Sequence, residues 1–199
     1  MTYAIIGFGD VGQALAGMFA RKDLNVSVAS RRGPESLVAK AQAIGPTVKP
    51  VTLDEALAAD TILLAVPYAQ ARELAGAVDW HGKIVIDVTN AYGVPVEELD
   101  GLPSSAVTAR ALAGSRLVKA WNHLAAGKLA QDPAVNGGRR VIFVASDDAD
   151  ASTTVAALVD RLGFAAVQLG ALAEGGALVQ ARGKSWAPLI FQDFIKFAN

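Results

Sequence analysis

A glycine-rich turn near the start of the chain restricts the fold more than any other feature. Residues 3–7 form a short apolar run that predicts a strand, and residues 11–20 have the apolar spacing of an amphipathic helix. Between them stands Gly7-Phe8-Gly9-Asp10-Val11-Gly12, with glycines at the spacing G-x-G-x-x-G. A strand, this turn and a helix in direct succession predict the first unit of a doubly wound α/β fold.

Each glycine of the turn has its own physical reason. Gly7 permits the sharp turn from strand to helix, Gly9 has no Cβ to obstruct a pyrophosphate, and Gly12 lets the helix approach the strand closely. The start of the helix offers free N–H groups and the positive end of its dipole. The turn therefore predicts a dinucleotide site formed by Gly7, Phe8, Gly9, Asp10, Val11 and Gly12. The alternative is an ordinary glycine-rich connection.

The end of the second predicted strand, residues 25–30, indicates which dinucleotide is bound. A site for NAD would place an aspartate or a glutamate there to accept hydrogen bonds from the ribose. This chain instead has Ser30, Arg31 and Arg32. One hydroxyl and two guanidinium groups suit a dianionic 2′-phosphate, which a carboxylate would repel. We therefore expect NADP(H). The alternative is a solvated basic corner.

Strand-like and helical patterns alternate along the rest of the chain. This alternation predicts an α/β protein with a Rossmann doubly wound parallel sheet and a small, mostly helical C-terminal lobe. We expect the NADP-binding Rossmann domain to span residues 1–145 and the lobe residues 146–199, with a boundary between 120 and 150. The last helix is expected over residues 186–197, which are rich in aromatic side chains.

Two further segments are expected to line the crevice at the carboxyl ends of the strands. Ala65, Val66 and Pro67 end one predicted strand, and Thr89 and Asn90 follow another. Ligands of such sheets lie beyond the carboxyl ends, so these five residues are predicted to contact the cofactor. The alternatives are helix initiation at Pro67 and a simple turn at Asn90.

Composition limits the partners and the location. Hydrophobic residues make up 52% of the 199 residues, cysteine is absent, and the formal net charge is -1. These values predict no disulfide, no metal site, and no nucleic acid as the main partner. The chain shows neither a signal-peptide pattern nor an apolar run long enough to span a membrane, so we expect no membrane association and a cytoplasmic location.

The sequence offers little acid–base machinery. Of the two histidines, His81 lies in a predicted surface turn, and His123 follows a predicted strand toward the crevice. His123 is equally compatible with a catalytic role and with an ordinary loop position. We find no Lys/His/Asp arrangement of the kind that an alcohol dehydrogenase needs beside its carbonyl. Hydride transfer to a flavin-like ring needs stacking and the exclusion of water instead.

Taken together, the motifs resemble the NADPH-dependent coenzyme F420 reductase family, which includes the cytosolic domains of the STEAP metalloreductases. The resemblance rests on the glycine turn, on Ser30-Arg31-Arg32, on Ala65-Val66-Pro67, and on two later segments, residues 118–122 and 185–190. It implies that Ser30, Arg31 and Arg32 hold the 2′-phosphate.

The same resemblance implies roles in the second half of the chain. Asn122 and His123 would be the catalytic residues beside the nicotinamide and the second ring, and Leu124 would contact the cofactor. The family resemblance also implies a homodimer, with Trp186 and its neighbours at the interface. The archaeal deazaflavin enzymes have His-Thr-Ile-Pro where this chain has Asn122-His123-Leu124-Ala125. The second substrate therefore stays open among a deazaflavin, a flavin, and a quinone or metal chelate reduced through flavin.

Three functions follow as hypotheses. The first is an NADPH-dependent oxidoreductase that transfers hydride between NADP(H) and a flavin or deazaflavin acceptor. The second is a binding module that senses NADPH without turnover. The third is a small imine or carbonyl reductase in which His123 is the acid.

Overall fold

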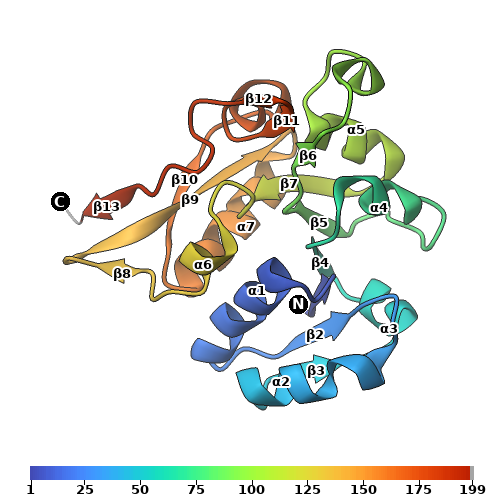
Figure 1. Cartoon of the computed structure of the whole chain (residues 1–199), viewed down its shortest axis with the longest axis vertical. Helices are drawn as coiled ribbons and strands as arrows, with labels where there is room; N and C mark the ends of the chain where they lie inside the picture. Colours follow the sequence, from blue (N-terminus) through green and yellow to red (C-terminus); the bar gives the residue numbers. More distant parts are fainter. Residues whose placement is uncertain (198–199) are drawn as a thin grey trace.

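A ten-stranded sheet forms the centre of the protein, seen in Figure 1 in a computed structural model that describes residues 1–197. The strands of this sheet are, in chain order, β1 (Tyr3–Ile6), β2 (Val26–Ala29), β3 (Val48–Pro50), β4 (Thr61–Leu64), β5 (Ile84–Asp87), β7 (Arg116–Ala120), β8 (Ala134–Val135), β9 (Gly138–Ser146), β10 (Ala165–Gln168) and β13 (Ile195–Phe197).

The strand order is β10-β9-β7-β5-β4-β1-β2-β3. All neighbours from β7 to β3 are parallel, whereas β9 runs antiparallel to β7 and parallel to β10. The order 3-2-1-4-5 reverses direction after β1, and such a reversal opens a crevice at the carboxyl ends of β1 and β4. The prediction of a doubly wound Rossmann sheet is confirmed.

Helices cover both faces of the sheet. They are α1 (Asp10–Arg21), η1 (Pro34–Leu37), α2 (Val38–Ile44), α3 (Leu53–Leu57), α4 (Tyr68–Glu73), η2 (Val96–Leu99), α5 (Ser104–Ala111), α6 (Ala126–Leu129), α7 (Ala149–Arg161) and the π-helical turn η3 (Leu172–Gly176). Thr52 caps α3 through a capping box with Glu55, as the spacing of these two residues indicates.

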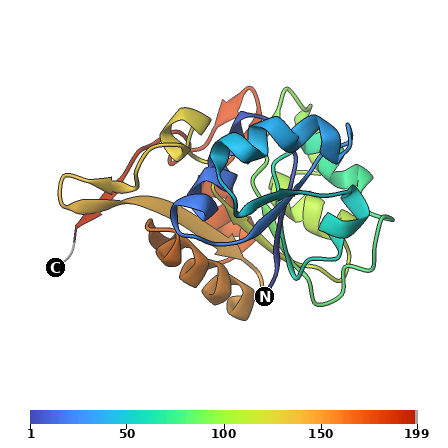
Figure 2. The same cartoon turned by 90° about the horizontal axis from the view of Figure 1, so that it is seen from below.

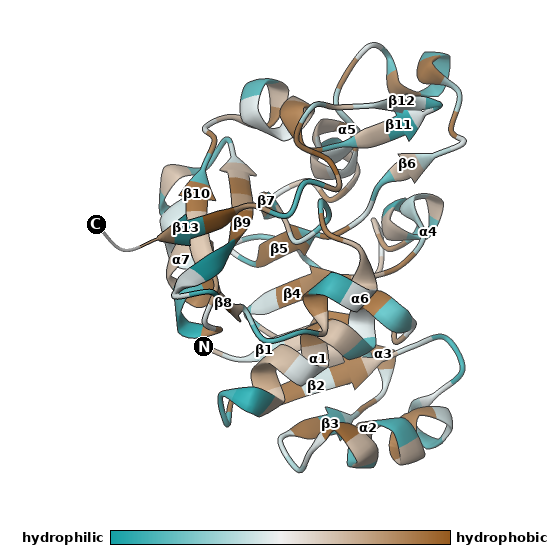
Figure 3. Cartoon of the chain, turned by 60° about the vertical axis from the view of Figure 1, so that its left-hand side comes forward, coloured by the Kyte–Doolittle hydropathy of each residue, from teal (hydrophilic) through white to brown (hydrophobic). Residues whose placement is uncertain are grey.

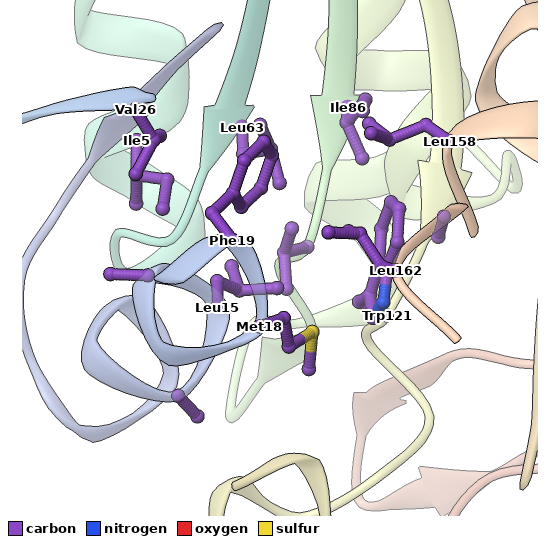
Figure 4. Close-up of a cluster of buried hydrophobic side chains, with 14 of the residues drawn as sticks. Ile5, Leu15, Met18, Phe19, Val26, Leu63, Ile86, Trp121, Leu158 and Leu162 are labelled. Atoms are coloured by element: carbon purple, nitrogen blue, oxygen red, sulfur yellow. The ribbon is translucent and has the colours of Figure 1, made fainter. Parts of the chain in front are cut away.

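Alternation along the strands builds a separate core on each face of the sheet. Ile5 points to the face covered by α1 and α7, where it joins Phe19 and Leu158 (Figure 4). Its neighbours Ala4 and Ile6 point to the other face, in the core that contains residues of α3, α4 and α5. In Figure 3 the inner strands β4 and β5 are coloured hydrophobic, while the outer helices α2 and α6 carry hydrophilic stretches.

A small second sheet lies beside the carboxyl ends of β5 and β7. It consists of β6 (Ala91–Tyr92), β11 (Ala181–Gly183) and β12 (Ser185–Trp186), in the order β12-β11-β6. The last strand, β13, returns to the main sheet and pairs antiparallel with the start of β9. In Figure 2, β13 projects from one side of the molecule together with the hairpin of β8 and β9.

The predicted helix over residues 186–197 is wrong. This segment consists of the end of β12, turns, and β13. Phe191 has a positive φ of 59°, which interrupts a helix. The Asp193 carboxylate pairs with the buried Arg140 at 2.7 Å, and the Val141 N–H donates to the Phe194 carbonyl. Pairing with β9 therefore overrides the helical spacing of the aromatic residues.

The C-terminal part is correspondingly less helical than predicted, because α7 and the turn η3 are accompanied by β10 to β13. The proposed boundary at residue 145 falls inside β9, and residues 198 and 199 lie outside the described part of the chain. The division into two domains stays a prediction. None of the helices between residues 1 and 197 combines the length and the hydrophobicity that a membrane-spanning segment needs.

Candidate functional site

The glycine turn connects β1 to α1 at the point where the sheet reverses its strand order. Gly7 has a positive φ of 100°, and a Cβ there would collide with the Ala65 carbonyl. A Cβ on Gly12 would collide with the Gly7 carbonyl. By contrast, a Cβ on Gly9, the N-cap of α1, would meet no atom within 4 Å. Two of the glycines are thus required by the fold, while the third borders open space.

A groove of about 620 Å³ lies in front of the turn. It brings together nine of the residues predicted to bind the cofactor, which come from three separate parts of the chain: Gly7, Phe8, Gly9, Ser30, Arg31, Arg32, Ala65, Val66 and Pro67. The N-terminus of α1 adds backbone N–H groups and a positive dipole end at the same place. The open space at Gly9 and the two arginines fit a phosphorylated dinucleotide.

Other groove residues were not predicted. Leu53 comes from the start of α3, and Gln70, Glu73 and Leu74 come from α4 and its C-cap. Positions 70, 73 and 74 have the i, i+3, i+4 spacing of one helix face. A helix predicted to start after Pro67 therefore indicates that these three residues share a surface.

The remaining predicted residues lie outside this groove. Asp10 lines a different groove of about 790 Å³, which runs along α1 between α6 and the turn before β3. Val11 and Leu124 pack against or within the hydrophobic core, and Gly12 faces the Gly7 backbone. The last four, Thr89, Asn90, Asn122 and His123, lie in the loops that follow β5 and β7. Whether these residues contact ligand stays a prediction.

Asn90 and Asn122 form a reciprocal pair between those two loops. The Asn90 Nδ2 donates to the Asn122 carbonyl at 2.9 Å, and the Asn122 Nδ2 donates to the Asn90 Oδ1 at 3.1 Å. The pair also holds the small sheet, since Asn90 Oδ1 accepts the Ala181 N–H and Asn122 Nδ2 donates to the Val179 carbonyl. The two asparagines therefore hold together the far end of the crevice.

The turn that delivers Asn122 is strained. Trp121 directly follows β7 and has a φ of 57°, in the left-handed region that costs a bulky residue about 1–2 kcal/mol. Its side chain is fully buried in the core beside α1 and α7 (Figure 4). Burial of the indole offsets the backbone strain and fixes the direction in which Asn122 leaves the strand.

A buried ion pair lies just below these loops. Lys119 and Asp87 are register partners on β7 and β5, with 3.5 Å between Nζ and Oδ2, and neither side chain exceeds 1% exposure. Ser105 donates to the Asp87 carboxylate at 2.6 Å, and Lys119 donates to the Thr89 carbonyl at 3.0 Å. Burial lowers the pKa of Lys119, and the Asp87 carboxylate opposes that effect. Sequence reasoning missed this Lys/Asp pair. Because both side chains also form hydrogen bonds with neighbouring groups, the pair supports the loop that contains Thr89.

His123 is fully buried, and its ring lies 4.9 Å from that of Phe143. Burial lowers its pKa to about 4, although the Val141 backbone and the Asp193 carboxylate act in the opposite direction. Neither ring nitrogen has a hydrogen-bond partner of ordinary geometry among residues 1–197. The imidazole is therefore neutral at pH 7.

Exposed aromatic rings gather beside the asparagine pair. Tyr92 and Phe191 lie parallel, with 6.4 Å between ring centroids, and Trp186 meets Phe191 edge-on at 5.2 Å. Tyr92 follows Asn90 by two residues, and the Phe191 N–H donates to the His123 carbonyl at 2.7 Å. Sequence reasoning assigned the C-terminal aromatic residues to a helix and missed this cluster.

Comparison with known proteins gives a family match for the first part of the chain. The model of the family described as NADP oxidoreductase, coenzyme F420-dependent, matches residues 2–91, from β1 to β6. Over these residues, which are fewer than half of the chain, the sequence matches that family model. The matched range contains the whole groove in front of the glycine turn. The resemblance inferred from the motifs is confirmed.

Relatives extend the likeness over more of the chain. The rat metalloreductase STEAP3 is 28% identical over 173 residues, which are 85% of this chain; the chain spans about a third (34%) of that relative's length. A structure of a hypothetical protein from Sinorhizobium meliloti is 40% identical with a TM-score of 0.91, and the match covers 98% of this chain and 96% of that one.

Two further structures have lower identity. A protein from Arthrobacter sp. FB24, assigned as an F420-dependent NADP-reductase, is 25% identical with a TM-score of 0.70 and 86% coverage of both chains. An imine reductase from Bacillus cereus, at 19% identity and a TM-score of 0.64, covers 87% of this chain and 56% of that one, and shows the fold alone. The matched family and the Arthrobacter structure agree with the predicted class of NADP-dependent oxidoreductases.

The glycines allow a separation of folding from binding. Gly9→Ala is expected to unfold at the wild-type temperature but to bind NADPH at least tenfold more weakly, because its Cβ enters only the space that a pyrophosphate needs. Gly12→Ala is expected to lose about 1–3 kcal/mol of folding stability, because its Cβ meets backbone. Thermal unfolding and NADPH titration check both, and equal behaviour of the two variants would contradict this assignment.

The burial of His123 is expected to make the folding stability of the protein sensitive to acid. The folded protein keeps the imidazole neutral down to about pH 4, while the unfolded chain takes up a proton near pH 6.5, so stability is lost as the pH falls between these values. The loss amounts to about 2 kcal/mol between pH 7 and pH 5. Urea unfolding at both pH values should show it in the wild type. His123→Gln should show a smaller loss, and an unchanged pH dependence would disprove the assignment.

Proposed function

We propose that the protein transfers a hydride between NADP(H) and a planar, flavin-like ring. The observation that carries the proposal is the groove in which the glycine turn lies together with Ser30, Arg31 and Arg32. In this reaction one hydride, with its two electrons, passes from NADPH to the acceptor ring and NADP+ results. Any further proton that the reduced ring takes up comes from solvent.

The nucleotide half of the site is complementary to the negative charges of NADPH. The N-terminus of α1 and Gly9 accept the pyrophosphate, and Ser30, Arg31 and Arg32 bind the 2′-phosphate. The Arg32 N–H donates to the Ser30 hydroxyl at 3.3 Å, which orders the segment. Among residues 1–197 the Arg32 guanidinium has no ion-pair or hydrogen-bond partner, so its donors are available to a phosphate.

The acceptor half of the site would bind its ligand through ring surfaces rather than through titrating groups. The loops that follow β5 and β7 hold Asn90 and Asn122, and the rings of Tyr92 and Phe191 lie beside them. Asp87 and Lys119 are buried and paired with each other. A site of this kind favours transfer between stacked rings, where orientation and the exclusion of water supply the rate. We assign Asn122 and His123 to this end of the crevice, and Thr89, Asn90 and Leu124 to its support.

The rival hypotheses are less well supported. An imine or carbonyl reductase with His123 as acid needs a protonated or accessible imidazole, whereas this ring is buried with a pKa of about 4. A sensing module without turnover would use the same nucleotide groove, so only a measurement of activity distinguishes it from the proposed enzyme. The predicted homodimer through Trp186, whose side chain is 64% exposed, and the predicted cytoplasmic location stay predictions.

Cofactor preference tests the nucleotide half. The double variant Arg31→Ala, Arg32→Ala is expected to lose about 1–3 kcal/mol of NADPH binding free energy per lost charge-assisted contact, with NADH binding unchanged. Arg161→Ala, on the exposed end of α7, is the control for removal of an arginine outside the groove. Calorimetric titration with both cofactors gives the result. An equal loss for NADPH and NADH would contradict the phosphate assignment.

Turnover tests the acceptor half. Rapid mixing of the protein and NADPH with riboflavin, FMN, FAD, a deazaflavin and a quinone should cause loss of the reduced nicotinamide absorbance with at least one of them. His123→Gln should retain most of this activity if no acid is needed. Tight NADPH binding with no turnover on any acceptor would favour the sensing module, and activity on imines that is abolished in His123→Gln would favour the third hypothesis.

A further inference from the structure

An ion pair spans the nucleotide groove. Arg31 follows β2, and Glu73 is the last residue of α4, forty-two positions later in the chain. The distance from Arg31 Nη1 to Glu73 Oε2 is 3.4 Å, and both residues line the groove in front of the glycine turn. The guanidinium proposed to receive the 2′-phosphate is therefore already in contact with a carboxylate.

A contribution to folding stability does not explain why a carboxylate stands at position 73. Glu73 stands at the C-terminal end of α4, where the helix dipole disfavours a negative charge. Its side chain is 60% exposed and that of Arg31 68%, and ion pairs with such exposure contribute between zero and about 1 kcal/mol to folding. Replacement of Glu73 is therefore expected to leave the fold intact. Its main effect is on the binding of a ligand in the groove.

We propose that Glu73 is a specificity-determining residue that competes with the 2′-phosphate of NADPH for Arg31. The inference rests on the proposed NADPH function and adds to it a limit on affinity. A phosphate that binds Arg31 must share the guanidinium with the carboxylate or displace it, and the two anions repel each other there. The Arg32 guanidinium, which has no partner among the described residues, receives the phosphate without such competition.

The competition weakens NADPH binding and leaves NADH untouched, because NADH carries no 2′-phosphate. Glu73 thus lowers the ratio of the affinities for NADPH and NADH. Since both charges are exposed, the effect must also fade as salt screens them.

The test is calorimetric titration of the intact protein with NADPH and with NADH at low and at high salt. Glu73→Gln is expected to bind NADPH about two- to fivefold more tightly than the wild type at low salt, and about equally at high salt. NADH affinity should not change. Glu97→Gln removes the same charge from an exposed residue of η2 that does not line the groove, and should bind both cofactors as the wild type does.

A double-mutant cycle separates competition from a general effect of charge. In the Arg31→Ala background, the change Glu73→Gln should no longer tighten NADPH binding, because the contested guanidinium is gone. An unchanged or weaker affinity of Glu73→Gln, or an equal gain with and without Arg31, overturns the inference while NADPH binding stands. If the wild type binds no NADPH, the proposed function itself fails, and the inference with it.

Discussion

The ion pair between Asp87 and Lys119 is the interaction on which the site depends. Two charges so deeply buried are tolerated only because each has several partners, and loss of either partner would leave the other uncompensated. The pair joins the carboxyl ends of two neighbouring strands and holds the Thr89 backbone from both sides. The loop that carries Asn90 therefore has a fixed starting point, and the asparagine pair above it transmits that position to the small sheet.

The glycine turn performs the corresponding task at the nucleotide end. Gly7 and Gly12 let α1 start directly above β1, so that the groove has a floor of backbone and a helix N-terminus at its end. The two ends of the crevice use different chemistry. The nucleotide end offers exposed charges and open space, and the other end offers buried amides and exposed rings. This asymmetry matches a cofactor with a phosphorylated tail and a partner that is mainly a ring.

Local sequence predicted nine of the residues that meet in the groove in front of the glycine turn, because the determinants of this groove are short in range. A glycine motif, the residues after β2 and the proline after β4 each identify themselves through neighbours in the chain, and the sheet then brings them together. The far end depends on long-range contacts such as Asn122 with Val179 and Phe191 with His123. The aromatic spacing of the last segment mimicked a helix, whereas Arg140 and the edge of β9 determined its actual path. Nor does any local pattern pair Asp87 with Lys119, since their meeting requires the register of β5 and β7.

The position of the far-end contacts in the chain also has a consequence for how the protein is made. The groove in front of the glycine turn is built from residues 6–74, which leave the ribosome before the residues of the far end. The amides of Asn90 and Asn122 find their remaining partners only when residues 179 and 181 have been synthesised, and the Phe191 ring arrives later still. A nascent chain thus contains all the residues of the groove well before it contains those of the far end. Cofactor present during synthesis has the opportunity to order the first half of the sheet before the second half is complete.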